Sequence, residues 1–195
     1  MQIFLIDVSE SSGKYYQTIN YSLSYHSTKE QDDLAKEKAN RIIEYLELDS
    51  KSDYQKILEI YNFIAQNVEY DLDRKDDNST EIEHSAYAAL CERKAVCQGY
   101  ALSLYRLMLL AGIDCRIVTG KLNGEDHAWN IVRLNGKYYY LDATMDRMAD
   151  FYRLFLVSTN EVKDYELSPE FLTDKFKNQY DIATERYENG TERIT

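Results

Sequence analysis

The chain has 195 residues, of which 44% are hydrophobic and 29% charged, a composition typical of a globular protein and not of a disordered one. Its formal net charge of −11 argues against a nucleic-acid partner, because phosphate binding requires a stripe of lysine and arginine that the sequence lacks. No apolar run reaches the roughly 18–20 residues of a membrane span. The three cysteines include no CxxC pair, so neither a disulfide framework nor a zinc site is expected.

The N-terminal segment, residues 1–27, is expected to form strands that lead into the main domain. Residues 1–8 and about 15–26 alternate with a period of two, which is typical of strands. The first residues lack the basic start of a signal peptide, and a strand at this point leaves open that the chain is part of a longer protein. We expect one catalytic domain over residues 28–180 and a polar C-terminal tail over 181–195.

Four helices are expected before residue 112. Ser27 with Glu30 and Ser52 with Gln55 fit the capping-box pattern, which predicts helices ending near residues 46 and 68. Thr80 with Glu83 predicts a third helix over about 81–92.

The fourth helix is expected from Cys97 to Ala111, with Gly112 as the residue that ends it.

The second half of the chain changes to the pattern of strands. Strands are predicted over 115–122, 127–134, 137–144 and 152–158, with Asn-Gly pairs at 123–124 and 135–136 that favour hairpin turns. Ser158 with Glu161 predicts one more short helix. Helices followed by antiparallel strands indicate an α+β domain.

Cys97 is the candidate nucleophile. It is expected at the start of an apolar helix, close to unpaired backbone N–H groups and the positive end of the helix dipole. Both favour the thiolate, and the same N–H groups can stabilise an oxyanion when the thiolate attacks a carbonyl. The alternative is that Cys97 is a small buried apolar side chain, as most free cysteines are. Cys91 and Cys115 are expected to be of that second kind.

A histidine and an aspartate are candidates to assist this thiol. A two-residue turn at Asn135-Gly136 makes Asp142 the diagonal neighbour of His127 on one face of the sheet. Such neighbours are about 7–8 Å apart at the backbone, which two side chains can span. The carboxylate would then orient the imidazole and stabilise the imidazolium. The alternatives are that His127 is an ordinary core or surface histidine and Asp142 a turn residue, and a three-residue loop would break the register.

Two segments resemble the core of the transglutaminase-like superfamily, papain-type cysteine enzymes that include bacterial members. They are "KAVCQGYALSLYRLMLLAGIDCRIVTG" and "DHAWNIVRLNGKYYYLDATMD". The family pattern combines a Val-Cys-x-Gly-Tyr/Phe-Ala helix, a Gly-Ile pair before a strand ending in Gly, a His-Ala-Trp-Asn strand and a strand ending in Asp-x-Thr. The chain matches each element across about residues 81–146, and residues 28–70 resemble the lead-in helices of bacterial members.

The resemblance implies a fold and roles for the site residues. The fold would be a papain-like, transglutaminase-core domain with N-terminal helices packed on an antiparallel sheet. Cys97 would be the nucleophile, His127 the general base and Asp142 the orienting acid. Tyr70 in "VEYD" is a candidate to hold the oxyanion, or else a packed tyrosine. Trp129 shares a sheet face with His127 and would shield the imidazole or wall the cleft, or else be a core tryptophan.

The chemistry implied is cysteine-dependent acyl transfer on amide bonds of a protein or peptide substrate, through a thioester. Hydrolysis is favoured over transfer to an amine. An amine can replace water as the acceptor only where water is excluded from the thioester, and no added domain that could exclude it is expected in this short chain. Crosslinking of protein glutamine with an amine and a non-catalytic binding module are the alternatives. The resemblance implies no cofactor, and the added domains and paired CxxC ligands of metal-dependent relatives are absent. Family analogy favours an extracellular or cell-envelope location, and the sequence leaves the oligomeric state undefined.

Overall fold

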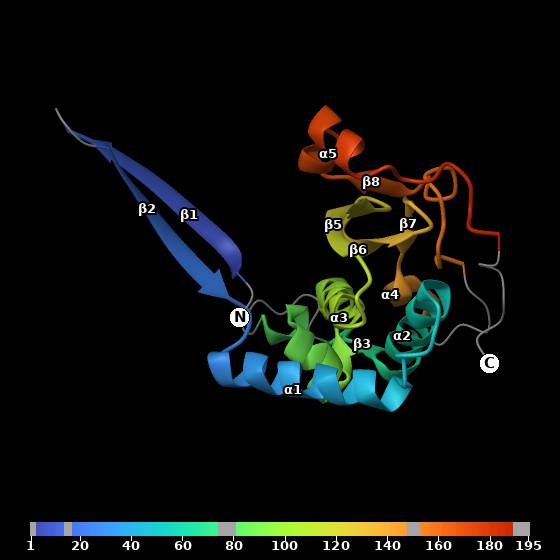
Figure 1. The fold of residues 1–195 in the computed structure, drawn as a ribbon. Helices are drawn as coiled ribbons and strands as arrows, with labels where there is room; N and C mark the ends of the chain where they lie inside the picture. The colour runs from blue at the N-terminus through green and yellow to red at the C-terminus, as the bar shows by residue number, and fades with distance from the viewer. Residues whose placement is uncertain (1–2, 14–16, 74–80, 148–152, 189–195) are drawn as a thin grey trace.

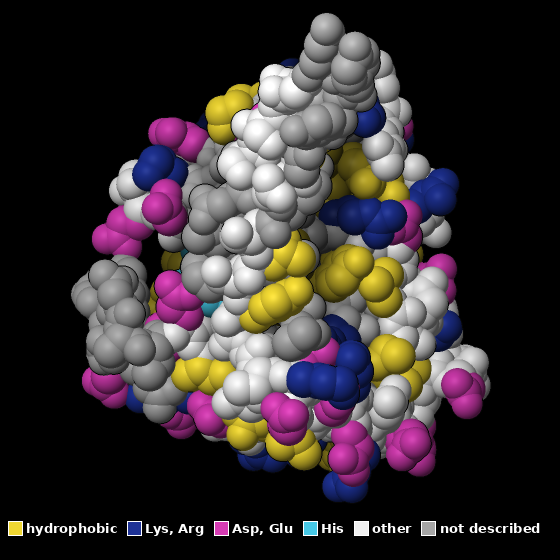
Figure 2. Space-filling model, turned by 90° about the vertical axis from the view of Figure 1, so that its left-hand side faces the viewer, with side chains coloured by type: hydrophobic (Ala, Val, Ile, Leu, Met, Phe, Trp, Pro, Cys, Tyr) yellow, Lys and Arg dark blue, Asp and Glu magenta, His cyan; other side chains and the backbone are white. Residues whose placement is uncertain are grey.

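The computed structural model describes residues 3–13, 17–73, 81–147 and 153–188. It begins with a hairpin of β1 (Ile3–Ser12) and β2 (Gln17–Tyr25), which pair antiparallel and project from the rest of the molecule (Figure 1). The two predicted strands are confirmed, except that residues 1–2 and 15–16 lie outside the described residues. On the face viewed from the hairpin side, apolar side chains are interspersed with acidic and basic ones (Figure 2).

The first helix, α1 (Lys29–Leu46), begins one residue later than Ser27 predicts. Its capping box is formed by Thr28 and Gln31: the Thr28 hydroxyl accepts from the Gln31 N–H at 3.2 Å, and the Gln31 side chain accepts from the Thr28 N–H at 2.8 Å. The prediction of a cap by Ser27 and Glu30 is therefore wrong. Both pairs fit the pattern, and with Thr28 as the cap the helix buries Asp32, which forms an ion pair with Arg106 at 2.7 Å.

The second helix, α2 (Asp53–Asn67), confirms the capping box of Ser52 and Gln55. It buries one stripe and packs against α3 (Cys97–Leu110), which starts and ends close to the predicted positions. The α3 helix is buried along most of its length, because α1 and α2 lie on one side of it and the sheet lies on the other (Figure 1). The core between these layers includes Ile57, Ile60, Ile64, Leu104 and Leu107.

The segment predicted as a third helix is broken. It forms a short 3-10 turn, η1 (Ile82–His84), and then a π-helical turn, η2 (Ala88–Glu92), while Thr80 lies outside the described residues. The break has a tertiary cause. The carbonyl of Glu83 accepts a hydrogen bond from the N–H of Val96 at 3.1 Å, so it is not used by a continuing helix. The Ser85 hydroxyl accepts from the Ala88 N–H at 3.1 Å and starts the next turn.

Two short strands connect these helices to the start of α3. They are β3 (Glu69–Tyr70) and β4 (Lys94–Ala95), which pair in parallel. Because β4 ends two residues before Cys97, this pairing fixes where α3 begins.

The sheet has the strand order β7-β6-β5-β8 and is antiparallel throughout. The strands are β5 (Cys115–Leu122), β6 (Glu125–Leu134), β7 (Lys137–Leu141) and β8 (Tyr165–Leu167). Both predicted Asn-Gly turns are confirmed, since all four turn residues have positive φ angles between 51° and 86°. The predicted α+β fold class is likewise observed.

The chain beyond β7 differs from the prediction in three places. The strand expected to reach residue 144 ends at Leu141, and the short helix α4 (Ala143–Asp146) follows. The strand expected over 152–158 is irregular over its described residues 153–158, where Leu156 has a φ of 49° and only Val157 bridges to the sheet. The Glu161 carboxylate does accept from the Ser158 N–H, but a turn forms there instead of a helix.

The remaining elements cover the outer face of the sheet. They are β8, η3 (Pro169–Phe171) and α5 (Asp174–Gln179), which form an aromatic and aliphatic cluster with the side chains of that face. Residues 181–188 continue beside the sheet to α2: the Ala183 N–H donates to the Tyr138 carbonyl, and Tyr187 stacks on Tyr54 of α2. This part of the expected tail therefore packs against the sheet and α2. Among the helices of the described ranges, none has the length and hydrophobicity needed to cross a membrane.

Candidate active site

Cys97 is the first residue of α3 and is partly exposed. The residue before it, Val96, has an extended backbone and provides no side-chain cap. The N–H groups in the first turn of a helix have no acceptor within that helix. The thiol therefore lies beside backbone donors and the positive end of the α3 dipole, as the sequence predicts.

Gly99 allows the chain to pack closely against this end of the helix. A methyl group at position 99 would be 2.7 Å from the Cβ of Ala95 and 2.8 Å from the Glu83 carbonyl oxygen. A side chain would thus displace the backbone that precedes Cys97. The glycine of the motif is required by this neighbouring segment.

His127 and Asp142 are in direct contact. The Nε2 atom of His127 is 2.7 Å from Oδ2 of Asp142, and their side chains are 8% and 3% exposed. The register that led to this expectation is confirmed, because Leu134 pairs with Lys137 and Asn130 with Leu141. Asp142 follows at the end of β7, where its other carboxylate oxygen, Oδ1, accepts from the Thr144 N–H at 3.0 Å.

Cys97 lies near enough to His127 for its thiol to act on the protonation of the imidazole. Burial lowers the pKa of His127, but the hydrogen bond to Asp142, the charge of that carboxylate and the interaction with the Cys97 thiol together raise it to about 10. Since Nε2 faces Asp142, Nδ1 is the nitrogen left to face the thiol. The start of α3 and the ends of two strands thus bring Cys97, His127 and Asp142 to one part of the molecule, and their joint role as a catalytic triad stays a prediction.

Tyr165 is a site residue that the sequence analysis missed. Its hydroxyl donates to Oδ2 of Asp142 at 2.7 Å, the same oxygen that contacts His127. Burial and the charge of Asp142 raise the pKa of Tyr165 above its ordinary value, so the phenol stays neutral and acts as a donor. Tyr165 follows Asp142 by 23 positions and is one of 18 tyrosines, so no local signal in the sequence marks it.

Aromatic rings enclose the imidazole. Trp129 lies nearly parallel to His127 with ring centres 5.9 Å apart, and Tyr165 meets both rings edge-on at 5.9 and 5.0 Å. Trp129 is 1% exposed and contributes to the outer core cluster, and its indole N–H has no partner among the described residues. It is therefore a core residue beside the imidazole, and a shielding role stays a prediction.

Asp146 is a second buried carboxylate, linked to Asp142 through the hydroxyl of Tyr61. The Tyr61 hydroxyl donates to the Asp142 carbonyl at 2.9 Å and to the Asp146 carboxylate at 2.8 Å. Asp146 also accepts from the N–H groups of Arg153 and Leu154, and burial raises its pKa. This network anchors the α4 turn to α2 and to the chain after it.

Tyr70 lies on β3, beside the strand that leads into Cys97. Its ring faces the guanidinium of Arg147 at 4.9 Å and is 6.4 Å from the ring of Tyr100. The structure thus brings Tyr70 to the same end of α3 as the thiol. A role in holding an oxyanion stays a prediction.

The other two cysteines lie in different surroundings. Cys115 is fully buried, and burial raises its pKa to about 12. Cys91 is half-buried, and burial raises its pKa as well. Burial thus disfavours the thiolate form of both residues. Among the residues that the structure describes, no group of three histidine, cysteine or acidic side chains is arranged to hold a metal ion.

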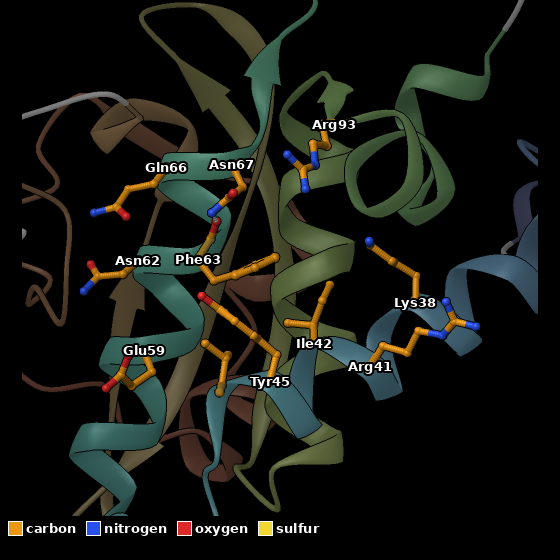
Figure 3. A pocket seen from close by; sticks show the side chains of 11 residues that line it. Lys38, Arg41, Ile42, Tyr45, Glu59, Asn62, Phe63, Gln66, Asn67 and Arg93 are labelled. Carbon is orange, nitrogen blue, oxygen red and sulfur yellow. Dashed lines mark hydrogen bonds between the residues drawn. The ribbon is translucent and has the colours of Figure 1, made fainter.

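A separate cavity of about 510 Å³ lies between α1 and α2, remote from these residues (Figure 3). Lys38 and Arg41 of α1 line one side of it, Arg93 lines its upper edge, and amide side chains of α2 line the other side. Neither Cys97, His127 nor Asp142 lines this cavity, so its size does not make it the reaction site.

The fold and the site define a class of α+β domain in which a helix that begins with cysteine packs on a sheet carrying a histidine–aspartate pair. The sequence profile of the transglutaminase-like superfamily matches residues 42–143, and the chain belongs to this superfamily. Membership supports a cysteine-enzyme function at the level of the family.

Three relatives illustrate the similarity. The chain is 30% identical over 128 residues to kyphoscoliosis peptidase of Homo sapiens and 28% identical over 117 residues to that of Mus musculus. These matches cover 56% and 54% of this chain but only 18% of each peptidase. A solved structure described as a TGase superposes on 71% of this chain and 44% of its own, with a TM-score of 0.52 and 19% identity. That superposition shows a shared fold.

Proposed function

We propose that the chain is a cysteine hydrolase that cleaves amide bonds of a protein or peptide through a thioester. The observation that carries the proposal is the place of His127, whose imidazole bonds the Asp142 carboxylate at 2.7 Å and whose pKa is affected by the Cys97 thiol at the start of α3. This is the order of groups that a thiol nucleophile, its base and an orienting acid require.

In the proposed reaction, the Cys97 thiolate attacks the carbonyl carbon and forms a tetrahedral oxyanion beside the N–H groups of α3. The carbon–nitrogen bond then breaks, and the imidazolium of His127 gives its proton to the leaving amine. Water attacks the resulting thioester while His127 takes up its proton. The carbon–sulfur bond breaks, the acid leaves, and the thiolate and imidazolium are restored.

Partial exposure of Cys97 supports water as the second acceptor. An amine acceptor, as in glutamine crosslinking, would need water to be kept from the thioester. The match to kyphoscoliosis peptidases supports the same outcome, since those proteins are named as peptidases.

The test is site-resolved alkylation followed by a substrate screen. At about pH 6, iodoacetamide should modify Cys97 well before Cys91 and Cys115, as read by peptide mass spectrometry. A peptide library should then show amide hydrolysis that Cys97→Ala abolishes, with little incorporation of an added amine. Equal, slow labelling of all three cysteines would refute the proposal. Dominant incorporation of the amine would show that the reaction is acyl transfer to an amine and not hydrolysis.

A further inference from the structure

One oxygen of Asp142 serves two donors. Oδ2 is 2.7 Å from Nε2 of His127 and 2.7 Å from the hydroxyl of Tyr165. Oδ1 has its own donor in the Thr144 N–H. Tyr165 and His127 therefore share Oδ2, the oxygen through which the Asp142 carboxylate acts on the imidazole.

Two donors on one carboxylate oxygen weaken each other. A phenol forms a stronger hydrogen bond with an isolated carboxylate than with one paired to an imidazolium. The reason is that the imidazolium partly neutralises the negative charge of the carboxylate. The Tyr165 hydroxyl thus stabilises the neutral imidazole more than the charged one. This matters because the proposed mechanism needs the imidazolium of His127 to release a proton to the leaving amine.

We propose that Tyr165 is a positioning residue that fixes the Asp142 carboxylate toward His127 and keeps the imidazolium a sufficiently strong acid to protonate the leaving amine. This inference rests on the proposed function. Tyr165 acts only through Asp142 and through the packing of its ring against His127 and Trp129.

The charged and titratable groups around this pair come from several elements. Cys97 of α3 faces the imidazole, and Asp146 of α4 places a second negative charge near Asp142. Tyr61 of α2 bonds that second carboxylate, and Arg153 places a positive charge near Tyr165. The hydrogen bonds of Tyr61 and Asp146 do not use the hydroxyl of Tyr165, so removing that oxygen leaves them in place.

The experiment removes the hydroxyl and keeps the ring. The full chain is prepared as wild type, as Tyr165→Phe and as the control Tyr138→Phe. Tyr138 donates to the Asp114 carboxylate at 2.6 Å on the same face of the sheet, so the control loses the same kind of bond away from the site. Imidazole titration by NMR is practical because the chain has only three histidines, and His127 is assigned with His127→Gln.

In Tyr165→Phe the pKa of His127 should rise by roughly 0.5–1 pH unit, while Tyr138→Phe leaves it unchanged. Turnover of the peptide amide found in the screen should fall about tenfold. Hydrolysis of p-nitrophenyl acetate should fall less, since its leaving group needs no proton.

An unchanged or lowered His127 titration in folded Tyr165→Phe would overturn the inference, even where Cys97 is reactive. Lack of reactive Cys97 in the wild type would instead overturn the proposed function. If Tyr165→Phe does not fold, Tyr165→Met, which also lacks the donor, takes its place and the same two results decide.

Discussion

Replacement of Asp142 by asparagine tests the contact on which the site depends. The substitution keeps the size of the side chain and removes its charge. The pKa of His127 lies at about 10 against an ordinary value of 6.5. At about 1.4 kcal/mol per pH unit, this difference corresponds to about 5 kcal/mol between the two protonation states, shared between Asp142 and Cys97.

We expect Asp142→Asn to lower the free energy of unfolding at pH 7 by about 3 kcal/mol, which for a domain of this size is roughly 10 °C in Tm. The sign follows from the raised pKa of His127. Its stabilising contribution is fully present below pH 6.5 and is lost as the pH rises through about 10. The difference in the free energy of unfolding between wild type and variant should therefore be much smaller at about pH 10.5 than at pH 7.

Two measurements check this prediction. Urea unfolding at both pH values gives the stabilities, and iodoacetamide labelling at about pH 6 should slow at least tenfold because the neutral imidazole no longer stabilises the thiolate. Asp114→Asn is the matched control, since Asp114 is a carboxylate bonded by Tyr138 but remote from the thiol. A variant as stable and as reactive as the wild type would show that the contact has no energetic role.

Three further outcomes are expected. Cys97→Ala should abolish turnover and change Tm by less than about 3 °C, because the thiol is partly exposed; a large loss of stability would favour a packing role. Gly99→Ala should cost about 2 kcal/mol in urea unfolding, because its methyl group would overlap Ala95. Thr28→Ala should cost about 1 kcal/mol and Ser27→Ala almost nothing, with the reverse result contradicting the observed cap.

Some of the site could be predicted because it depends on short-range geometry. The Asn135-Gly136 turn sets the pairing of β6 and β7, and that register directs Asp142 toward His127 on one face of the sheet. Likewise, the motif around Cys97 predicts a helix start, and α3 begins at that residue.

Other features depend on contacts between distant segments. The break after Glu83 arises because its carbonyl bonds Val96, 13 positions away, and no local pattern encodes that choice. Tyr165 reaches Asp142 only because β8 joins the sheet beside β5, at Gly120, where a side chain would collide with the Glu166 carbonyl. The predicted strand over 152–158 fails for a similar reason, since the backbone there turns to deliver N–H groups to Asp146.

The sequence by itself determined the features that neighbouring residues control: the hairpin turns, the start of α3, the register that joins His127 to Asp142, and the family. Only the tertiary structure decided which capping box operates, where the helix after residue 81 breaks, and which of 18 tyrosines bonds the carboxylate of the catalytic candidate Asp142. The reason is physical. Turn and cap geometries are fixed by the conformational preferences of a few adjacent residues. Contacts between remote segments are instead selected by the packing of the whole chain, which satisfies buried polar groups together.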